Sequence, residues 1–226
     1  MANRLVVFDL DGTLIDGYAG ITDALGFALE RLGRPPIPED RVRRMVGEGL
    51  DRLLEKAVGT ADAPKGLSLF RERYEQVAVS GSRPMPGVPE VLREIAGAGW
   101  TMAVASNKPT DYSRRILAAL GLARFFFAVA GPGPVAPPKP DPSMLRRLVA
   151  DTGAAASDTV VVGDMEIDAR FARAAGCRVV LVPGGSRTSE ELAAEEPDAL
   201  LASLVELPGW LRRSASSASG GRARPR

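Results

Sequence analysis

The spacing of apolar residues changes along the chain, and each change marks a predicted element. A β-branched apolar run at residues 4–8 predicts a buried strand. Four later segments place apolar residues three and four positions apart, which is typical of one helix face. These segments predict helices at 18–32, 38–47, 49–58 and 66–79. No strand-like run occurs between residues 16 and 84.

From residue 87 onward, apolar runs alternate with helix-like segments. The predicted strands are 100–106, 125–131, 159–164 and 178–183, and the predicted helices are 88–98, 110–120, 142–153 and 167–175. Strands that are apolar throughout are typical of a parallel sheet covered by helices on both faces. The predicted fold class is therefore α/β, with a doubly wound parallel sheet of the Rossmann-like kind.

The first predicted strand is separated from the others by the helical segment. We therefore predict a discontinuous core domain, residues 1–15 and 85–213, with a small α-helical cap domain, residues 16–84, inserted into it. The Pro- and Gly-rich break at 84–87 predicts a hinge. The last residues, 214–226, contain few apolar side chains and predict a disordered tail.

Composition excludes several classes of protein. A net charge of +1 gives no basic surface for nucleic acid or membrane, and no apolar run reaches transmembrane length. The first strand begins too early for a signal peptide. The single cysteine, Cys177, excludes an internal disulfide, fits a reducing cytoplasm and is predicted to be a packing thiol. We expect a cytoplasmic monomer or homodimer that binds neither nucleic acid nor membrane.

The basic residues narrow the chemistry. The chain has no histidine, which excludes a histidine base, proton relay or metal ligand. Only four of the 29 basic residues are lysines. Lysine is a compact charge that suits phosphate oxygens, so Lys108 and Lys139 are candidates for phosphate contacts. Lys56 and Lys65 lie in the predicted cap and are expected on solvated faces.

Two aspartates, Asp9 and Asp11, follow the first strand. Carboxylates two positions apart share one face of an extended chain, where they repel each other unless a cation lies between them. Oxygen ligands of this kind suit magnesium. An ordinary Asp–Gly turn at Gly12 explains the same residues, and both interpretations stay open from this segment alone.

Ligands of doubly wound sheets bind beyond the carboxyl ends of the strands. The residues expected at those ends carry carboxylate, hydroxyl, amide and ammonium groups, which suit phosphate and magnesium. They are Asp9, Asp11, Thr13, Ser106, Asn107, Lys108, Lys139, Asp164 and Asp168. Other interpretations exist for some of them, because Ser106 and Asn107 are typical helix caps and Asp168 suits the first turn of a helix.

Four of these segments, in this order, resemble the haloacid dehalogenase superfamily of phosphohydrolases over about residues 4–207. The motifs read DLDGT at 9–13, ASN at 105–107, KPDP at 139–142 and GDMEID at 163–168. The resemblance implies that Asp9 is a nucleophile that forms an aspartyl-phosphate. It implies that Asp11 protonates the leaving group and then activates water.

The resemblance also implies Mg²⁺ as the cofactor and a small phosphorylated metabolite as the substrate. The implied metal site comprises the Asp9 and Asp164 carboxylates and the Asp11 backbone carbonyl. Asp168 would bind a metal water or orient Lys139. The implied contacts to the phosphoryl group come from Lys139 and from Thr13, Ser106, Asn107 and Lys108. Thr13 is also expected to secure the loop that contains Asp11.

Within the superfamily, residues 46–59, 83–100 and 105–109 look most like phosphoglycolate phosphatases, which implies 2-phosphoglycolate as the substrate. The Gly47–Glu48–Gly49 turn is expected either to offer backbone N–H groups to a substrate carboxylate or to be a plain helix connection. Three residues, Gly17, Ser106 and Met165, depart from the usual pattern without removing a catalytic group.

Other functions remain open from the sequence. A pyrophosphatase, a nucleotidase or a sugar phosphatase would share the same core. A mutase of the β-phosphoglucomutase type needs a cap histidine that this chain lacks. A phosphonatase needs a cap lysine, for which Lys56 is a weak candidate. A binding protein on the same fold would have little need for the aspartates and Lys139.

Overall fold

Six parallel strands form one sheet in the computed structural model, which describes residues 3–133 and 136–220. The strand order β5-β4-β1-β6-β7-β8 puts β1 at the centre. The strands are β1 (Leu5–Phe8), β4 (Thr101–Ala105), β5 (Ala128–Ala130), β6 (Thr159–Gly163), β7 (Arg178–Leu181) and β8 (Ala199–Leu200). This topology confirms the predicted α/β class with a doubly wound parallel sheet.

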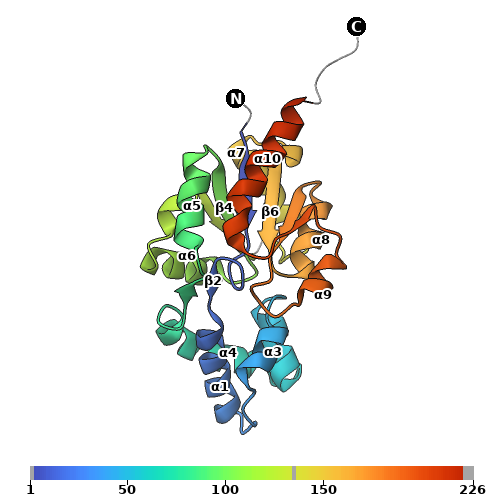
Figure 1. Cartoon of the computed structure of the whole chain (residues 1–226). Helices are drawn as coiled ribbons and strands as arrows, with labels where there is room; N and C mark the ends of the chain where they lie inside the picture. The colour runs from blue at the N-terminus through green and yellow to red at the C-terminus, as the bar shows by residue number, and fades with distance from the viewer. Residues whose placement is uncertain (1–2, 134–135, 221–226) are drawn as a thin grey trace.

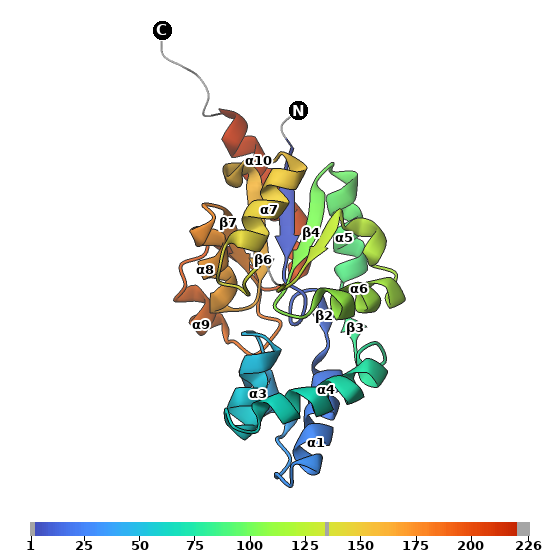
Figure 2. The same cartoon turned by 180° about the vertical axis from the view of Figure 1, so that it is seen from behind.

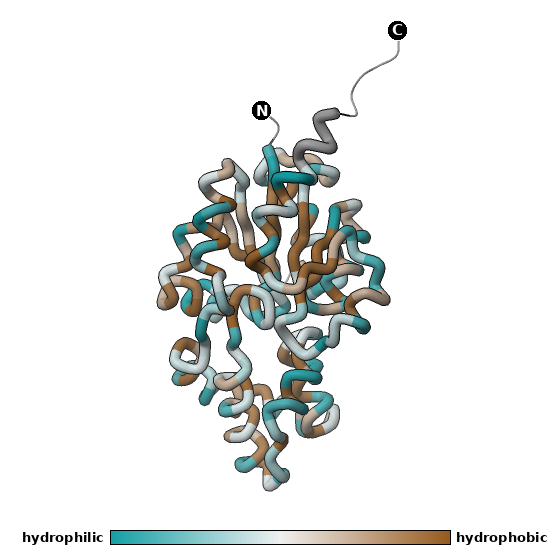
Figure 3. The backbone as a smooth tube through the Cα atoms, in the orientation of Figure 1, coloured by the Kyte–Doolittle hydropathy of each residue, from teal (hydrophilic) through white to brown (hydrophobic). Residues whose placement is uncertain are grey.

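Helices cover both faces of the sheet, because each strand is apolar on both sides (Figures 1 and 2). Val6 and Phe8 pack in one buried cluster with α5 (Val88–Gly97), α6 (Thr110–Ala119) and α10 (Leu207–Gly220). Leu5 and Val7 pack in the other, with α7 (Ser143–Thr152), α8 (Glu166–Ala174) and α9 (Ser189–Ala193). Figure 3 shows the apolar sheet enclosed between these layers.

The inserted helices form a cap below the carboxyl ends of the strands (Figure 1). They are α1 (Tyr18–Arg31), α2 (Glu39–Met45), α3 (Leu50–Val58) and α4 (Ala63–Val77). Buried Leu25, Leu54 and Phe70 belong to their shared apolar interior. An ion pair of 2.6 Å between Arg73 and Asp23 joins α4 to α1.

A short antiparallel strand pair connects the cap to the core. Ile15 of β2 (Ile15–Asp16) pairs with Pro84 of β3 (Arg83–Pro84). The Asp16 carboxylate accepts from Arg83 at 2.7 Å and from Arg43 of α2 at 3.2 Å. Burial alone would raise the pKa of Asp16, but the two guanidinium groups hold it below its ordinary value. The strand pair lies where the sequence predicts only linkers, and the division into a core domain and a cap domain stays a prediction.

Several elements differ from the sequence prediction. The strand predicted at 125–131 is shorter, because a 3-10 turn, η1 (Ala123–Phe125), precedes β5. Two further 3-10 turns are η2 (Ala156–Asp158) and η3 (Leu204–Glu206), and neither α9 nor β8 was predicted.

The chain end also differs from the prediction. Helix α10 continues to Gly220, so residues 214–220 are helical where a disordered tail is predicted. Alanine has the highest helix propensity, and extending an existing helix is easier than starting one. The rest of the predicted tail, 221–226, lies outside the described residues. None of the described helices is long and apolar enough to cross a membrane.

Candidate active site

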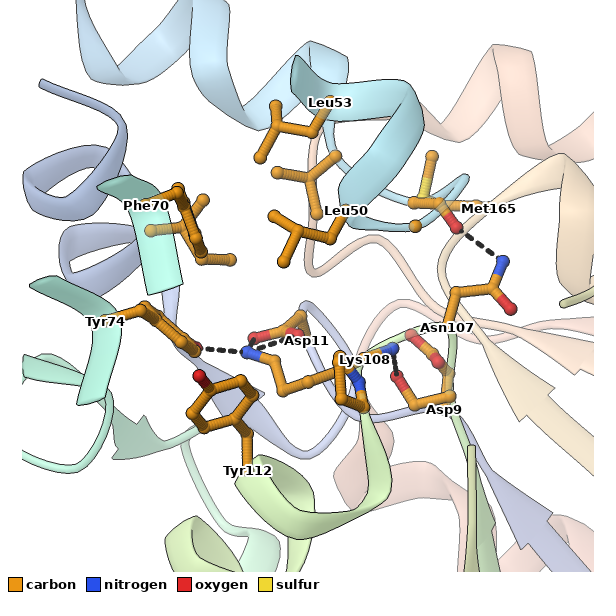
Figure 4. A pocket seen from close by; sticks show the side chains of 16 residues that line it. Asp9, Asp11, Leu50, Leu53, Phe70, Tyr74, Asn107, Lys108, Tyr112 and Met165 are labelled. Carbon is orange, nitrogen blue, oxygen red and sulfur yellow. Dashed lines mark hydrogen bonds and ion pairs between the residues drawn. The ribbon is translucent and has the colours of Figure 1, made fainter. Parts of the chain in front are cut away.

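A cavity of about 70 Å³ lies between the cap and the carboxyl ends of β1, β4 and β6 (Figure 4). Phe8 at the end of β1 pairs with Val104 on one side and with Val162 on the other. Because of this register, the residues that follow the three strands lie side by side at the carboxyl edge of the sheet. Asp9 is fixed there by its backbone N–H, which donates to the Val162 carbonyl at 2.8 Å.

Lys139 joins two of the predicted aspartates. Its Nζ lies 2.7 Å from Asp9 Oδ1 and 2.7 Å from Asp168 Oδ1. The Lys139 and Asp168 side chains are only 2% and 1% exposed. Burial alone would lower the pKa of Lys139, but Asp168 and Asp9 raise it above its ordinary value, so the side chain stays cationic. A fixed cation therefore stands beside Asp9.

Asp164 presents an unpaired oxygen to the same place. Its Oδ1 accepts from the Thr13 hydroxyl at 3.0 Å, while its buried Oδ2 has no hydrogen-bond partner among the described residues. Burial and the nearby charges of Asp9 and Asp168 raise the pKa of Asp164 well above its ordinary value. A cation beside Asp164 Oδ2 would favour the charged form of this buried carboxylate.

The three aspartates fit a divalent cation. Ligand oxygens of Asp9, Asp164 and Asp168 lie within 4.8 Å of one another. A Cβ at Gly12 or at Gly185 would come within 2.4 Å or 1.9 Å of Asp164 Oδ2, so the two glycines keep this oxygen uncrowded. Such an all-oxygen set suits magnesium, which keeps several waters of its own.

Asp168 has little capacity left for direct metal binding. One oxygen accepts from Lys139, and the other accepts from the Met165 backbone N–H at 3.2 Å. Burial raises the pKa of Asp168 to about 6 against the opposing effect of Lys139. These contacts are compatible with both interpretations, as an orienting partner of Lys139 and as an acid in the first turn of α8, and the role of Asp168 stays a prediction.

Asp11 and Lys108 form a second buried ion pair. The Lys108 Nζ lies 2.9 Å from Asp11 Oδ2 and 2.6 Å from the Tyr74 hydroxyl of the cap helix α4 (Figure 4). Burial raises the pKa of Asp11, although Lys108 opposes this. Burial alone would lower the pKa of Lys108, but Asp11 and Tyr74 raise it. Lys108 therefore points into the site.

Ser106 and Asn107 line the cavity, but neither caps α6, whose N-terminus has no side-chain cap. The Asn107 amide accepts from the Lys139 backbone N–H at 2.7 Å and donates to the Gly47 carbonyl of the cap at 2.9 Å. The Ser106 hydroxyl accepts from the Lys108 N–H at 3.3 Å. Asn107 therefore joins the Lys139 loop to the cap, and phosphate binding by both residues stays a prediction.

Thr13 does not line the cavity. Its hydroxyl donates to Asp164, so the structure supports its expected role in securing the loop. Phosphate binding by Thr13 stays a prediction. The Asp–Gly turn interpretation also holds in part, because Gly12 has a φ of +89° and its N–H donates to the Ile15 carbonyl at 2.8 Å. The turn and the acidic site are one feature.

The cap supplies an apolar wall. The cap side chains that line the cavity are Ile21, Val46, Leu50, Leu53, Phe70 and Tyr74, none of them charged. From the core, Tyr112 lies edge-on to Tyr74 with ring centroids 4.9 Å apart. The sequence interpretation missed both tyrosines. The chain contains only three tyrosines, and this scarcity is the one sequence signal that could have drawn attention to them.

The turn between α2 and α3 contacts the core directly. Gly47 has a φ of +125°, and a Cβ there would lie 2.5 Å from the Met165 sulfur. Its neighbour Gly49 has a φ of +95°, but a Cβ there would meet nothing closer than 3.8 Å. The turn is therefore a docking point of the cap, and substrate binding by its N–H groups stays a prediction.

We expect Gly47→Ala to lower kcat/KM about 10-fold, because the new methyl group pushes Met165 away and adds backbone strain of about 1–3 kcal/mol. Gly49→Ala is the matched control, since it carries similar strain without the contact, and its effect should be smaller. Adding Met165→Ala to Gly47→Ala should restore part of the loss. Steady-state kinetics of the four proteins test this, and equal losses in the two glycine variants would contradict it.

Three residues outside the site lie in the surroundings that the sequence predicts, two lysines on the surface and one cysteine in the interior. Lys56 pairs with Glu48 at 2.9 Å with 40% of its side chain exposed, and it does not line the cavity. Lys65 is exposed. Cys177 is buried, and burial raises the pKa of its thiol to about 11, which makes it a poor nucleophile.

Comparison with known proteins shows which family this chain resembles. Residues 6–182 match the family model described as haloacid dehalogenase-like hydrolase. A phosphoglycolate phosphatase of Vibrio parahaemolyticus is 35% identical over 214 residues, which cover 90% of this chain and 94% of that protein. One of Caulobacter vibrioides is 37% identical over 210 residues, with 90% and 88% covered.

A solved structure agrees in fold. The crystal structure of a predicted phosphoglycolate phosphatase from Haemophilus somnus superimposes with a TM-score of 0.85 at 27% identity, covering 91% of this chain and 96% of that one. The similarity extends over the sheet and the cap alike.

Proposed function

Because this chain belongs to the haloacid dehalogenase-like hydrolase family, we propose that it is a Mg²⁺-dependent phosphatase that hydrolyses 2-phosphoglycolate through an aspartyl-phosphate on Asp9. The observation that carries the proposal is the pairing of Asp9 with the buried Lys139 ammonium, 2.7 Å away, beside the unpartnered oxygen of Asp164. A nucleophilic carboxylate, a fixed cation and an open metal position are the parts that phosphoryl transfer requires.

Asp9 and Asp11 would carry out different parts of the reaction. The Asp9 carboxylate would attack phosphorus, and the P–O bond to the leaving group would break. Asp11 would donate its proton to the leaving oxygen. It would then take a proton from the water that hydrolyses the aspartyl-phosphate, which releases phosphate and restores Asp9. Lys139 would offset the charge that collects on the phosphoryl oxygens.

The residues present fit a magnesium ion. Asp9, Asp164 Oδ2 and the Asp11 carbonyl would hold it directly, and Asp168 would hold it through a water because both its oxygens are engaged. When bound, the metal would neutralise phosphate charge so that an anionic nucleophile can approach.

We expect Mg²⁺ at about 100 times its dissociation constant to stabilise the protein by about 2.7 kcal/mol. For a chain of this size that raises Tm by roughly 5–10 °C. In Asp164→Asn the shift should vanish. Without metal this variant should be at least as stable as the wild type, since it removes one of three crowded buried carboxylates. Differential scanning calorimetry with EDTA and with Mg²⁺ tests this, and an unchanged shift in the variant would argue against the site.

Two observations support a small substrate such as 2-phosphoglycolate. The curated relatives at 35% and 37% identity bear the name phosphoglycolate phosphatase. The cavity of about 70 Å³ is far below the roughly 300–1,000 Å³ of pockets that hold drug-sized ligands. A nucleotide or a hexose phosphate would need a larger cavity. A phosphonatase is disfavoured because Lys56 lies on the surface of the cap.

The test is phosphate release, with Mg²⁺, from 2-phosphoglycolate, glucose 6-phosphate, pyrophosphate and a nucleoside monophosphate. We expect the highest kcat/KM with 2-phosphoglycolate. A higher value with any other member of the panel would replace the proposed substrate. No release from any of them would contradict the proposed activity.

A further inference from the structure

The end of the cavity that contains Asp11 has one cation, Lys108, which the sequence predicts as a contact to the phosphoryl group but which pairs with Asp11 and Tyr74 in the structure. Among the side chains that line the cavity, Lys108 is the one that carries a positive charge. Lys139 is already held by Asp9 and Asp168 at the phosphoryl end. An anionic group on the leaving side therefore has a single cationic partner available.

The position of Lys108 matches the shape of the substrate. In 2-phosphoglycolate a single methylene carbon separates the ester oxygen from the carboxylate. The group that binds the carboxylate must therefore lie beside the group that protonates the ester oxygen. Lys108 Nζ lies 3.0 Å and 2.9 Å from the two carboxylate oxygens of Asp11, which is the proposed proton donor.

The cap contributes the Tyr74 hydroxyl beside Lys108. Tyr74 accepts from Lys108 at 2.6 Å, and no described residue accepts a hydrogen bond from the Tyr74 hydroxyl in return. That hydrogen is available to an anionic oxygen next to Lys108. Figure 4 shows the Tyr74 hydroxyl and Asp11 meeting at the Lys108 ammonium, with the apolar side chains of Leu50, Leu53 and Phe70 beyond them.

We propose that Lys108 and Tyr74 together bind the carboxylate of the substrate and so determine specificity for 2-phosphoglycolate. Lys108 supplies the charge from the core, and Tyr74 supplies the hydrogen bond from the cap. The apolar cap side chains offer no partner to a second charged group on the substrate. We therefore expect a short leaving group with a single negative charge. This inference rests on the proposed function, because it takes 2-phosphoglycolate as the substrate.

The test compares 2-phosphoglycolate with ethyl phosphate, which keeps the ester and replaces the carboxylate by a methyl group. The wild type should prefer 2-phosphoglycolate in kcat/KM by about 10- to 100-fold, the value of a charge-assisted hydrogen bond. Lys108→Met, which keeps the length of the side chain, should abolish most of this ratio. Tyr74→Phe should reduce it by about 3- to 10-fold.

The ratio separates recognition from structural damage. If Lys108 or Tyr74 had a purely structural role, its substitution would lower kcat/KM for both substrates by the same factor. The ratio would then stay unchanged, which would overturn the inference. Arg115→Gln is the matched control. It breaks a core–cap ion pair with Glu75 outside the cavity, so it should not change the ratio. If Lys108→Met does not fold, Tyr74→Phe alone decides between the two outcomes.

The outcomes also separate this inference from the proposed function. A wild type with no preference for 2-phosphoglycolate over ethyl phosphate would contradict the proposed substrate and, with it, the carboxylate site. A wild-type preference that survives in both variants would contradict only the roles of Lys108 and Tyr74. A preference that falls in both variants and persists in Arg115→Gln would support them.

Discussion

Asp9→Asn is expected to lower kcat for phosphate release by at least about 10⁴-fold, the scale of losing a nucleophile that works with its neighbours as a unit. The amide that replaces the carboxylate has no negative charge with which to attack phosphorus. It also leaves Lys139 with Asp168 as its one remaining carboxylate partner. The measurement is single-turnover and steady-state phosphate release with Mg²⁺ present.

The folded state of Asp9→Asn should survive, because the substitution reduces repulsion among three buried carboxylates. Its Tm without metal should therefore be no lower than that of the wild type. Asp51→Asn, on the exposed surface of α3, is the matched control and should keep full activity. Wild-type turnover by Asp9→Asn would exclude an aspartyl-phosphate on this residue.

Asp11→Asn is expected to lower kcat by about 10²- to 10⁴-fold, the usual contribution of a general acid–base group. The loss should depend on the leaving group. With 4-nitrophenyl phosphate, whose leaving group needs no proton, formation of the aspartyl-phosphate should stay fast while its hydrolysis slows. The variant should release about one equivalent of nitrophenol per enzyme in a rapid burst.

Stopped-flow absorbance measures this burst. The asparagine oxygen can still accept a hydrogen bond from Lys108, so the variant should keep most of the Asp11–Lys108–Tyr74 contact. A steady release of nitrophenol without a burst, at the wild-type rate, would show that Asp11 neither protonates the leaving group nor activates water. An equal loss with alkyl and aryl phosphates would argue that Asp11 acts only through the loop.

The sequence predicts most helices and strands of this fold, because their apolar spacing is strong. It does not predict the order of the strands, since β1 pairs with β4 and β6, which follow it by about a hundred residues or more along the chain. Periodicity within each strand contains no information on such distant partners. The two-residue strands β2, β3 and β8 are too short for any periodicity.

One missed helix had a recognisable signal. Helix α9 begins with a capping box, in which Thr188 accepts from the Glu191 N–H and Glu191 accepts from the Thr188 N–H. Threonine followed three positions later by glutamate is visible in the sequence. The helix has only five residues, too few for an apolar repeat, which is why the spacing alone missed it.

Part of the candidate site could be predicted from the sequence, and part could not. Asp9, Asp11, Lys139 and Asp164 were predictable because each follows a strand of the parallel sheet, where such a fold places its ligands. The partners of Lys108 were not. Tyr74 reaches Lys108 only because the cap lies over the core, and the sequence of α4 presents this tyrosine simply as part of an apolar helix face.

The strand pair β2–β3 has a consequence for how such proteins diversify. The chain leaves the core at Asp16 and returns at Arg83, and the two residues face each other across the ladder. The chain between them is covalently joined to the core only at this strand pair. A cap can therefore be lengthened, trimmed or replaced within the gene without displacing the sheet that positions Asp9. Such changes alter Tyr74 and the apolar wall within one stretch of the chain, whereas Lys108 and the aspartates of the candidate site lie outside that stretch.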